Sequence, residues 1–128
     1  DYIHSLDSLK LANKISIEQK KLKKKLKIFI QINIGTEDQK SGIEKKDLLD
    51  FYDVCTRKLD LDIIGLMCLP PNNENSIKYF FEMKELVNKI TVKELSMGMS
   101  NDFLEASIQG ATFVRIGSGI FGSRPKKP

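Results

Sequence analysis

The sequence lacks several features that would assign it to a broad class at once. No apolar run reaches the length of about 18 residues that could span a bilayer. The start shows no charged segment followed by an apolar stretch and a small-residue cleavage site. There is also no low-complexity linker and no internal repeat. These absences predict a single cytoplasmic domain with no membrane partner.

Cysteine and histidine are scarce. Cys55 and Cys68 are the two cysteines, and His4 is the one histidine. Neither cysteine belongs to a CxxC pair or lies near His4 in the sequence, so neither a disulfide framework nor a zinc site is indicated. Each cysteine sits inside an apolar pattern, which predicts two buried, reduced thiols and no metal.

Acidic residues are outnumbered, because 21 Lys and Arg face 17 Asp and Glu and give a net charge of +4. Much of the excess lies in one lysine run, with a smaller cluster at Lys126 and Lys127. The run has no interleaved aromatic residues for base stacking and leads directly into a strand-like segment. A solvated connector is therefore favoured over a polyanion-binding patch, and no nucleic-acid partner is predicted. The run comprises Lys20, Lys21, Lys23, Lys24, Lys25 and Lys27.

Four short apolar runs rich in branched residues recur along the chain. Each has the length and composition of a buried strand. They span residues 27–34, 62–69, 92–97 and 112–117.

Segments with helical spacing separate these runs, which distinguishes a β/α succession from an all-β meander. Shorter helices are predicted near the start, from a stripe of Leu6, Leu9 and Ala12, and over 101–109. Ser100 is the predicted N-cap of that last helix and Gly110 its stop. The two longer stripes are Leu48, Tyr52, Cys55 and Leu59, and Phe80, Met83, Val87 and Ile90.

This alternation predicts a parallel sheet with right-handed crossovers. Two architectures fit the pattern. One is an open doubly wound sheet, and the other is part of an eight-stranded barrel, which needs about 250 residues to close. Four strands are half of such a barrel.

Residues 117–122 match the GxGxxG pattern letter for letter. A dinucleotide fingerprint must open a helix and be followed about 20 residues later by an acidic residue that holds the ribose. Here Ser123, Arg124 and Pro125 follow, and the sequence ends at Pro128. The pattern therefore does not indicate a dinucleotide site.

The same glycines fit a phosphate site better, because barrels grip phosphate with the loops after their last strands and a helix N-terminus. The third run ends in 96–100 (SMGMS) and leads straight into a helix, and the fourth ends in 115–118 (RIGS). Backbone NH groups and the hydroxyls of Ser100 and Ser118 could form a cradle of neutral donors, with Gly117 allowing close approach. A serine N-cap and a glycine turn without any ligand remain an equal alternative on these features.

An ordered set of motifs resembles the pyridoxal phosphate homeostasis protein family. The match extends over essentially the whole chain, and the SMGMS, VRIG and IFG segments are its most specific parts. The segments are 3–10 (IHSLDSLK), 30–33 (IQIN), 40–42 (KSG), 65–67 (GLM), 95–100 (LSMGMS) and 114–117 (VRIG).

That family is similar to the N-terminal barrel domain of alanine racemase and to fold type III decarboxylases. The resemblance implies an α/β fold, the carboxyl-terminal half of a (β/α)8 barrel, with pyridoxal 5'-phosphate in its mouth. It implies that Arg115 faces the pyridine nitrogen, where an arginine keeps that nitrogen unprotonated and weakens the ring as an electron sink. The implied phosphate ligands are Ser100, Gly117 and Ser118, and Ser96 and Met97 are expected to line the approach.

Two departures from the family pattern stand out. Ser118 is commonly threonine in the family, which keeps the hydroxyl. The lysine that binds the cofactor covalently lies at the end of the family's first strand, which we expect upstream of Asp1. No lysine in 1–128 matches that motif, so the chain is expected to be a partial domain that needs the missing half of its barrel.

The resemblance predicts a non-catalytic protein that binds pyridoxal 5'-phosphate and serves its intracellular homeostasis, with PLP-dependent enzymes as possible receivers. A fold type III racemase or decarboxylase is the alternative. Those enzymes carry a second β domain after the barrel, whereas this sequence stops soon after its last predicted strand.

Overall fold

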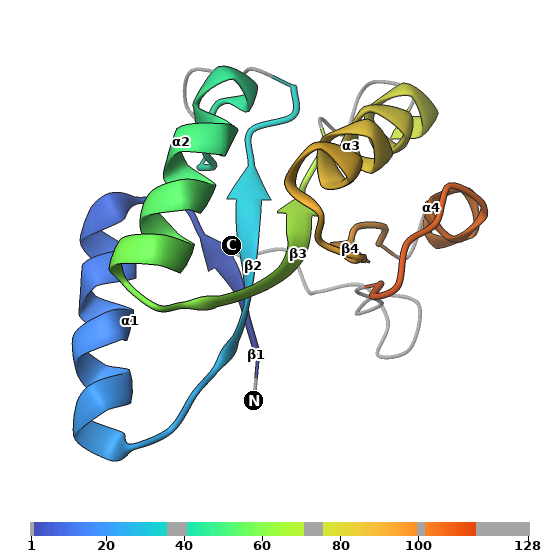
Figure 1. Cartoon of the computed structure of the whole chain (residues 1–128). Coiled ribbons are helices and arrows are strands. Elements are labelled where there is room, and N and C mark those ends of the chain that lie inside the picture. Colours follow the sequence, from blue (N-terminus) through green and yellow to red (C-terminus); the bar gives the residue numbers. More distant parts are fainter. Residues whose placement is uncertain (1, 36–40, 71–75, 100–101, 115–128) are drawn as a thin grey trace, which may run out of the picture.

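Strands and helices alternate along the chain (Figure 1). The structure, a computed structural model, describes residues 2–35, 41–70, 76–99 and 102–114. Within these residues, no helix is long and apolar enough to cross a membrane. The elements are β1 (Tyr2–Leu6), α1 (Leu9–Leu22), β2 (Lys27–Ile32), a 3-10 turn η1 (Lys45–Asp47), α2 (Leu48–Asp53), a π-helical turn η2 (Val54–Lys58), β3 (Asp62–Cys68), α3 (Ser76–Ile90), β4 (Glu94–Ser96) and α4 (Phe103–Ile108).

The four strands form one parallel sheet in the order β1-β2-β3-β4, so neighbours in space are neighbours in the chain. A doubly wound sheet reverses its order at a switch point, and a barrel does not. Residues 112–114 extend the series, because Phe113 bridges Ser96 in parallel. The sheet therefore confirms the predicted barrel segment over the open doubly wound alternative.

The helices cover one face of this sheet. Alternate strand residues, such as Ile28 and Ile30 of β2, point into a single apolar cluster with the helices, and both are fully buried. Phe29 and Met67 are also buried but lie outside that cluster, on the other face. Burying a large apolar side chain contributes roughly 1.5–3 kcal/mol. The helices contribute Ala12, Ile15, Leu48, Cys55, Tyr79, Phe80, Met83, Leu86, Val87, Ile90 and Ala106 to the cluster.

β1 was not among the predicted strands. Its polar His4 and Ser5 interrupt the apolar pattern, and Tyr2 is half exposed. The pairing of β1 with β2 shifts register between Ile3 and Leu6, a β-bulge. Because the bulge adds a residue, Ile3 and Leu6 both pack on the helix face although they are three positions apart.

The predicted stripe of Leu6, Leu9 and Ala12 is wrong in detail. Leu6 belongs to β1, and Leu9 is 51% exposed. The helix α1 begins after Ser8, whose side chain accepts a hydrogen bond from the Leu11 amide at 3.1 Å. Its buried stripe is Ala12, Ile15 and Ser16.

The apolar stripe that starts at Leu48 is confirmed, but the helix that carries it changes from α-helical to π-helical after Asp53. Leu48 and Cys55 are buried in the helix-side cluster, and Tyr52 and Leu59 pack against it. The turn after Asp53 is π-helical. Such turns widen a helix by one residue and are commonly single-turn features. The stripe from Phe80 to Ile90 is confirmed as the buried face of α3.

Cys55 and Cys68 are both buried and reduced, as predicted. Burial removes Cys55 from water and raises the pKa of its thiol from 9.0 to about 11. This thiol is accordingly protonated and inert near neutral pH.

Three boundaries differ from the prediction. β2 ends at Ile32 and β4 covers only Glu94–Ser96. The next amides, of Asn33 and Met97, donate instead to the carbonyl oxygens of Ile43 and Phe113. α4 begins at Phe103 with Asp102 as its N-cap residue, whereas the predicted cap Ser100 lies outside the described residues. Gly110 has a φ of 102° just after α4 and is the predicted stop.

Candidate ligand site at the carboxyl edge of the sheet

The carboxyl end of β4 lies beside the start of the next strand segment. The amide of Met97 donates to the carbonyl oxygen of Phe113 at 3.0 Å, and the amide of Phe113 donates to the Leu95 oxygen at 3.0 Å. The two segments run parallel, so both continue toward the same edge of the sheet. Ligands in parallel β/α folds bind at this edge.

The turn after β4 is held in place by one carboxylate. Asp102 accepts a hydrogen bond from the Met99 amide at 2.6 Å through Oδ1 and one from the Ser76 hydroxyl at 2.9 Å through Oδ2. Gly98 has a φ of 100°, which side-chain-bearing residues rarely adopt. The turn is therefore tied to the first residue of α3 and shaped by a glycine.

Ser96 points to the face of the sheet that the helices leave uncovered. It is fully buried, and its Oγ lies 2.8 Å from Nδ1 of His4. His4 belongs to β1, at the other side of the described sheet. This contact links the first and fourth strands across the uncovered face.

An aromatic layer supports that contact. The His4 ring stacks on Phe29 with centroids 4.3 Å apart and planes 18° apart. Phe113 meets both rings edge-on, at 5.4 Å from His4 and 5.2 Å from Phe29. Edge-to-face and offset pairs of this kind are the favoured aromatic geometries. His4 is thus a packed, hydrogen-bonded residue.

One row of paired residues crosses the uncovered face from β2 through β3 to β4, near the carboxyl ends of these strands. Gln31 pairs with Met67, and Met67 pairs with Ser96. All three are buried, and the Gln31 side chain donates to the Ser41 carbonyl at 3.4 Å. The row offers an amide, a thioether and a hydroxyl. This neutral set suits an aromatic ring and a phosphate held by uncharged donors. No group of three or more His, Cys, Asp or Glu that could hold a metal gathers among the described residues.

The structure places two of the predicted site residues. Ser96 lies on the uncovered face, at the β4 end of the row described above. Met97 is fully buried in the helix-side cluster, so its side chain does not line the approach, and only its backbone lies at the edge. The reason is strand alternation, because Leu95 and Met97 share one face and Ser96 takes the other. Ser100, Arg115, Gly117 and Ser118 lie outside the described residues and stay predictions.

Sequence reasoning missed three residues of this face. Phe29 and Gln31 alternate with the apolar residues of β2, and that two-residue period could have assigned them to the uncovered side. Phe113 gave no such signal, because a single aromatic residue at the start of a strand has no periodicity. The pairing of His4 with Ser96 spans 92 positions and has no local signature.

Comparison with known proteins agrees with this fold. Residues 1–125 match the family described as alanine racemase, N-terminal domain. The chain belongs to this family. A pyridoxal phosphate homeostasis protein of Aquifex aeolicus is 36% identical over 131 residues, which is 95% of this chain and 58% of that protein. The chain therefore spans less than two thirds of that relative.

Solved structures of the family share the fold. PipY of Synechococcus elongatus, without PLP, superposes with a TM-score of 0.85 at 30% identity, covering 95% of this chain and 61% of PipY. PipY with PLP bound gives a TM-score of 0.82 at 28% identity, with the same coverage. Alanine racemase from Bartonella henselae, with covalently bound pyridoxal phosphate, gives 0.70 at 19% identity, covering 97% of this chain and 38% of the racemase. That last likeness supports the fold alone.

Proposed function

We propose that the protein carrying this chain binds pyridoxal 5'-phosphate at the carboxyl edge of the sheet and helps to keep the supply of this cofactor in balance in the cytoplasm. It is proposed to have no turnover of its own. The observation that carries the proposal is the bond from the Met97 amide to Phe113. This bond sets side by side the two strand segments whose next residues include the predicted phosphate ligands. The PLP-bound PipY structure supports the same ligand.

The phosphate is proposed to be held by Ser100, Gly117 and Ser118. In the sequence, Ser100 directly follows Met99, and 115–118 directly follow Val114. Hydroxyls and backbone amides are good donors to a phosphate and leave its charge in place. Ser96 and the backbone of Met97 are proposed to flank the pyridine ring of the cofactor.

Arg115 is proposed to face the nitrogen of the cofactor ring. When bound, pyridoxal phosphate supplies an aldehyde that reacts with amines and a ring that accepts electrons. A guanidinium group does not release its proton, so Arg115 would donate to the ring nitrogen and leave it unprotonated. That arrangement weakens the electron-accepting role of the ring and fits a carrier better than a racemase or decarboxylase.

Covalent attachment is proposed to need a lysine from the family's first strand, upstream of Asp1, and residues 1–128 are proposed to be a partial domain. The test is to incubate the protein with cofactor, reduce it with borohydride and map the added mass. We expect no stoichiometric addition at any lysine of 1–128 and one addition at an upstream lysine in the longer protein. Stoichiometric labelling at one lysine of 1–128 would contradict this assignment.

The phosphate cradle can be tested in the longer protein. Replacing Ser100 with Ala together with Gly117→Val removes one hydroxyl and fills the close approach, so we expect PLP affinity to fall at least about tenfold. Ser107→Ala, a change on the exposed side of α4, is the matched control. Unchanged affinity for both PLP and inorganic phosphate in the double variant would count against the cradle.

PLP-dependent enzymes are the proposed receivers of the cofactor. We expect the PLP-loaded protein to activate an apoenzyme of this class faster than an equal concentration of free PLP does, with excess inorganic phosphate present in both assays. It should not racemise or decarboxylate amino acids. Turnover of an amino acid by the purified protein would favour the racemase or decarboxylase alternative.

A further inference from the structure

A lysine-rimmed hollow lies at the amino-terminal end of the strands, opposite the candidate PLP site. It has a volume of about 230 Å³ and lies between the end of α1 and the turn that precedes β3. Its remaining lining comes from Ser16, Gln19, Leu59 and Asp60. Four lysines surround it, namely Lys20, Lys23, Lys24 and Lys25.

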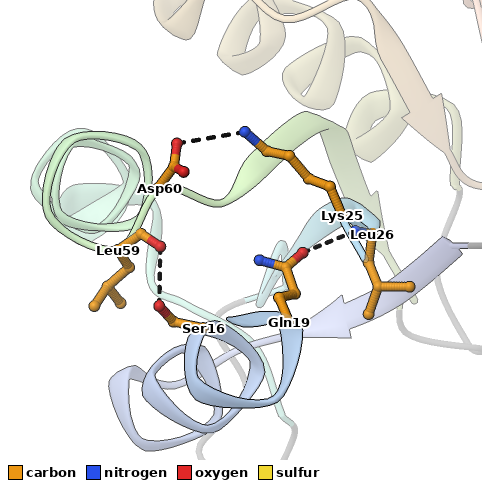
Figure 2. A network of polar contacts seen from close by, with 6 residues as sticks. All are labelled: Ser16, Gln19, Lys25, Leu26, Leu59 and Asp60. Atoms are coloured by element: carbon orange, nitrogen blue, oxygen red, sulfur yellow. Dashed lines mark hydrogen bonds and ion pairs between the residues drawn. The ribbon is translucent and has the colours of Figure 1, made fainter. Parts of the chain in front are cut away.

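Two hydrogen bonds build the frame of this hollow (Figure 2). The Ser16 hydroxyl of α1 donates to the Leu59 carbonyl at 3.0 Å, which joins α1 to the opposite wall. The Leu26 amide donates to Oε1 of Gln19 at 2.8 Å, which ties the connector back to the helix. Ser16 is 5% exposed, so the first of these bonds is well shielded from water.

The backbone that carries the lysines is also fixed. The amides of Lys23 and Lys24 both donate to the carbonyl oxygen of Gln19, the latter at 3.2 Å. Lys23 has a φ of 52°, a left-handed conformation that turns the chain around the hollow. A ligand would therefore need to order only the lysine side chains, which lowers the entropic cost of binding.

Lysines outnumber acidic residues among the described residues that line the hollow. Asp60 is the single acidic residue among those that line it, and it pairs with Lys25 at 3.3 Å (Figure 2). The side chains of this pair are 56% and 85% exposed, so the pair is weak and can exchange. Lys20 and Lys23 lie on the same rim and carry the same sign of charge, and a bound anion would offset their mutual repulsion.

The helix macrodipole explains only part of this cluster. Cations in the last turn of a helix are favourable, which accounts for Lys20 and Lys21. Lys24 and Lys25 follow the end of the helix, and they lie around the hollow instead of along the helix surface. The described residues that line the hollow include no aromatic side chain, so we expect recognition of a ligand by its charge and not by base stacking.

We propose that this hollow binds a compact anion with two or more phosphate groups, such as inorganic triphosphate or the phosphates of a nucleoside triphosphate. Its size fits a phosphate chain and not a protein helix. Lys25 and Leu26 directly precede β2, and Asp60 and Leu61 directly precede β3, so the site is distinct from the carboxyl edge.

Calorimetric titration of the intact, PLP-saturated protein with inorganic triphosphate tests the proposal. We expect saturable binding of one triphosphate at about 50 mM salt, with a Kd below about 100 μM that weakens strongly as salt rises. Monophosphate should bind at least about tenfold more weakly, because it engages fewer lysines. Absence of saturable triphosphate binding would overturn the proposal.

Two double variants with the same loss of charge localise the site. Lys20→Gln with Lys23→Gln should weaken triphosphate binding at least about tenfold. Lys84→Gln with Lys89→Gln, on the exposed side of α3, should leave it within about twofold, since these lysines are remote from the hollow. An equal loss in both variants would mean diffuse attraction by net charge and would also overturn the site.

Two further titrations identify the source of the phosphates. Equal affinity for triphosphate and for adenosine and guanosine triphosphates supports recognition of the phosphate chain alone. A single-stranded oligonucleotide or an acidic peptide that binds more tightly than triphosphate, and depends on the same lysines, would overturn the compact site in favour of an extended polyanion surface. Failure of any of these tests leaves the PLP proposal untouched.

Discussion

Nδ1 of His4 lies 2.8 Å from Oγ of Ser96, so one polar contact joins β1 to β4 across the face that the helices leave uncovered. The Ser96 end of this contact is fully buried, and the His4 end stacks on Phe29. A shielded hydrogen bond between groups held by packing on both sides is stronger than an exposed one. It should therefore couple the two strands energetically.

A double-mutant cycle on His4 and Ser96 tests this coupling. We expect Ser96→Ala to cost about 1 kcal/mol and His4→Ala about 2 kcal/mol, since the latter also removes the aromatic stacking. The double variant should cost about 1 kcal/mol less than the two single costs together. Urea unfolding provides the measurement, with Ser5→Ala on the exposed part of β1 as the control. Strict additivity would show that the contact carries no energy.

Cys55 should resist thiol reagents in the folded protein. With its pKa raised to about 11 by burial, only about 0.1% of this thiol is ionised near pH 8, and the side chain is fully buried. In a Cys68→Ala background, we expect no labelling by an aromatic disulfide reagent until urea unfolds the chain. Rapid labelling under native conditions would contradict the buried placement.

The same raised pKa predicts a loss of stability in alkali. Between about pH 9 and 11 the unfolded chain loses the Cys55 proton while the folded chain keeps it, so ionisation favours the unfolded state. Relative to Cys55→Ala, the wild-type protein should lose up to about 3 kcal/mol of unfolding free energy across this range. Below pH 9 the difference between the two proteins should not change with pH. The comparison isolates the Cys55 thiol, because all other ionisable groups are the same in the two proteins.

Thr91 is expected to destabilise the end of α3. Its φ is 59°, a left-handed conformation that is unfavourable for a β-branched residue. We expect Thr91→Gly to raise the unfolding free energy by about 1 kcal/mol. Gly110→Ala is the reciprocal control, with an expected loss of about 1 kcal/mol. At that position φ is 102° and an added Cβ would come no closer than 3.7 Å to Lys84, so only the backbone is tested.

Gly65 should tolerate no side chain. A Cβ at this position would lie 2.1 Å from the carbonyl oxygen of Glu94 and 2.6 Å from its carbonyl carbon. Because both atoms belong to the backbone of β4, the strands themselves would have to separate. We expect Gly65→Ala to cost at least about 3 kcal/mol or to prevent folding. A cost below about 1 kcal/mol, as judged by urea unfolding and soluble yield, would refute the close approach.

The repeating parts of the fold were predictable because they repeat. The spacing of Phe80, Met83, Val87 and Ile90 identified the buried face of α3, and the branched runs identified β2, β3 and β4. β1 was not predicted, because a β-bulge and two polar residues break its alternation of apolar and polar side chains. The π-helical turn after Asp53 was not predicted, because such a turn leaves the spacing of apolar residues almost unchanged.

The site was predictable where a motif stays local. The SMGMS segment located the turn after β4, and Ser96 does lie on the uncovered face. Its neighbour Met97 was assigned to the same approach, although alternation along a strand sends it to the helix side. The contact partners of Ser96 come from β1 and from Phe113, and no pattern within a short window of sequence contains that information.

The sequential order of the strands has a consequence for how the chain folds. Each strand of the described sheet pairs with the strands that precede and follow it in the chain, so neighbouring units can dock in turn by closing loops of modest length. The His4–Ser96 contact closes 92 positions and depends on all four strands. Loop-closure entropy and contact order place such a contact late on the folding pathway. Replacing His4 should accordingly accelerate unfolding while leaving the folding rate nearly unchanged.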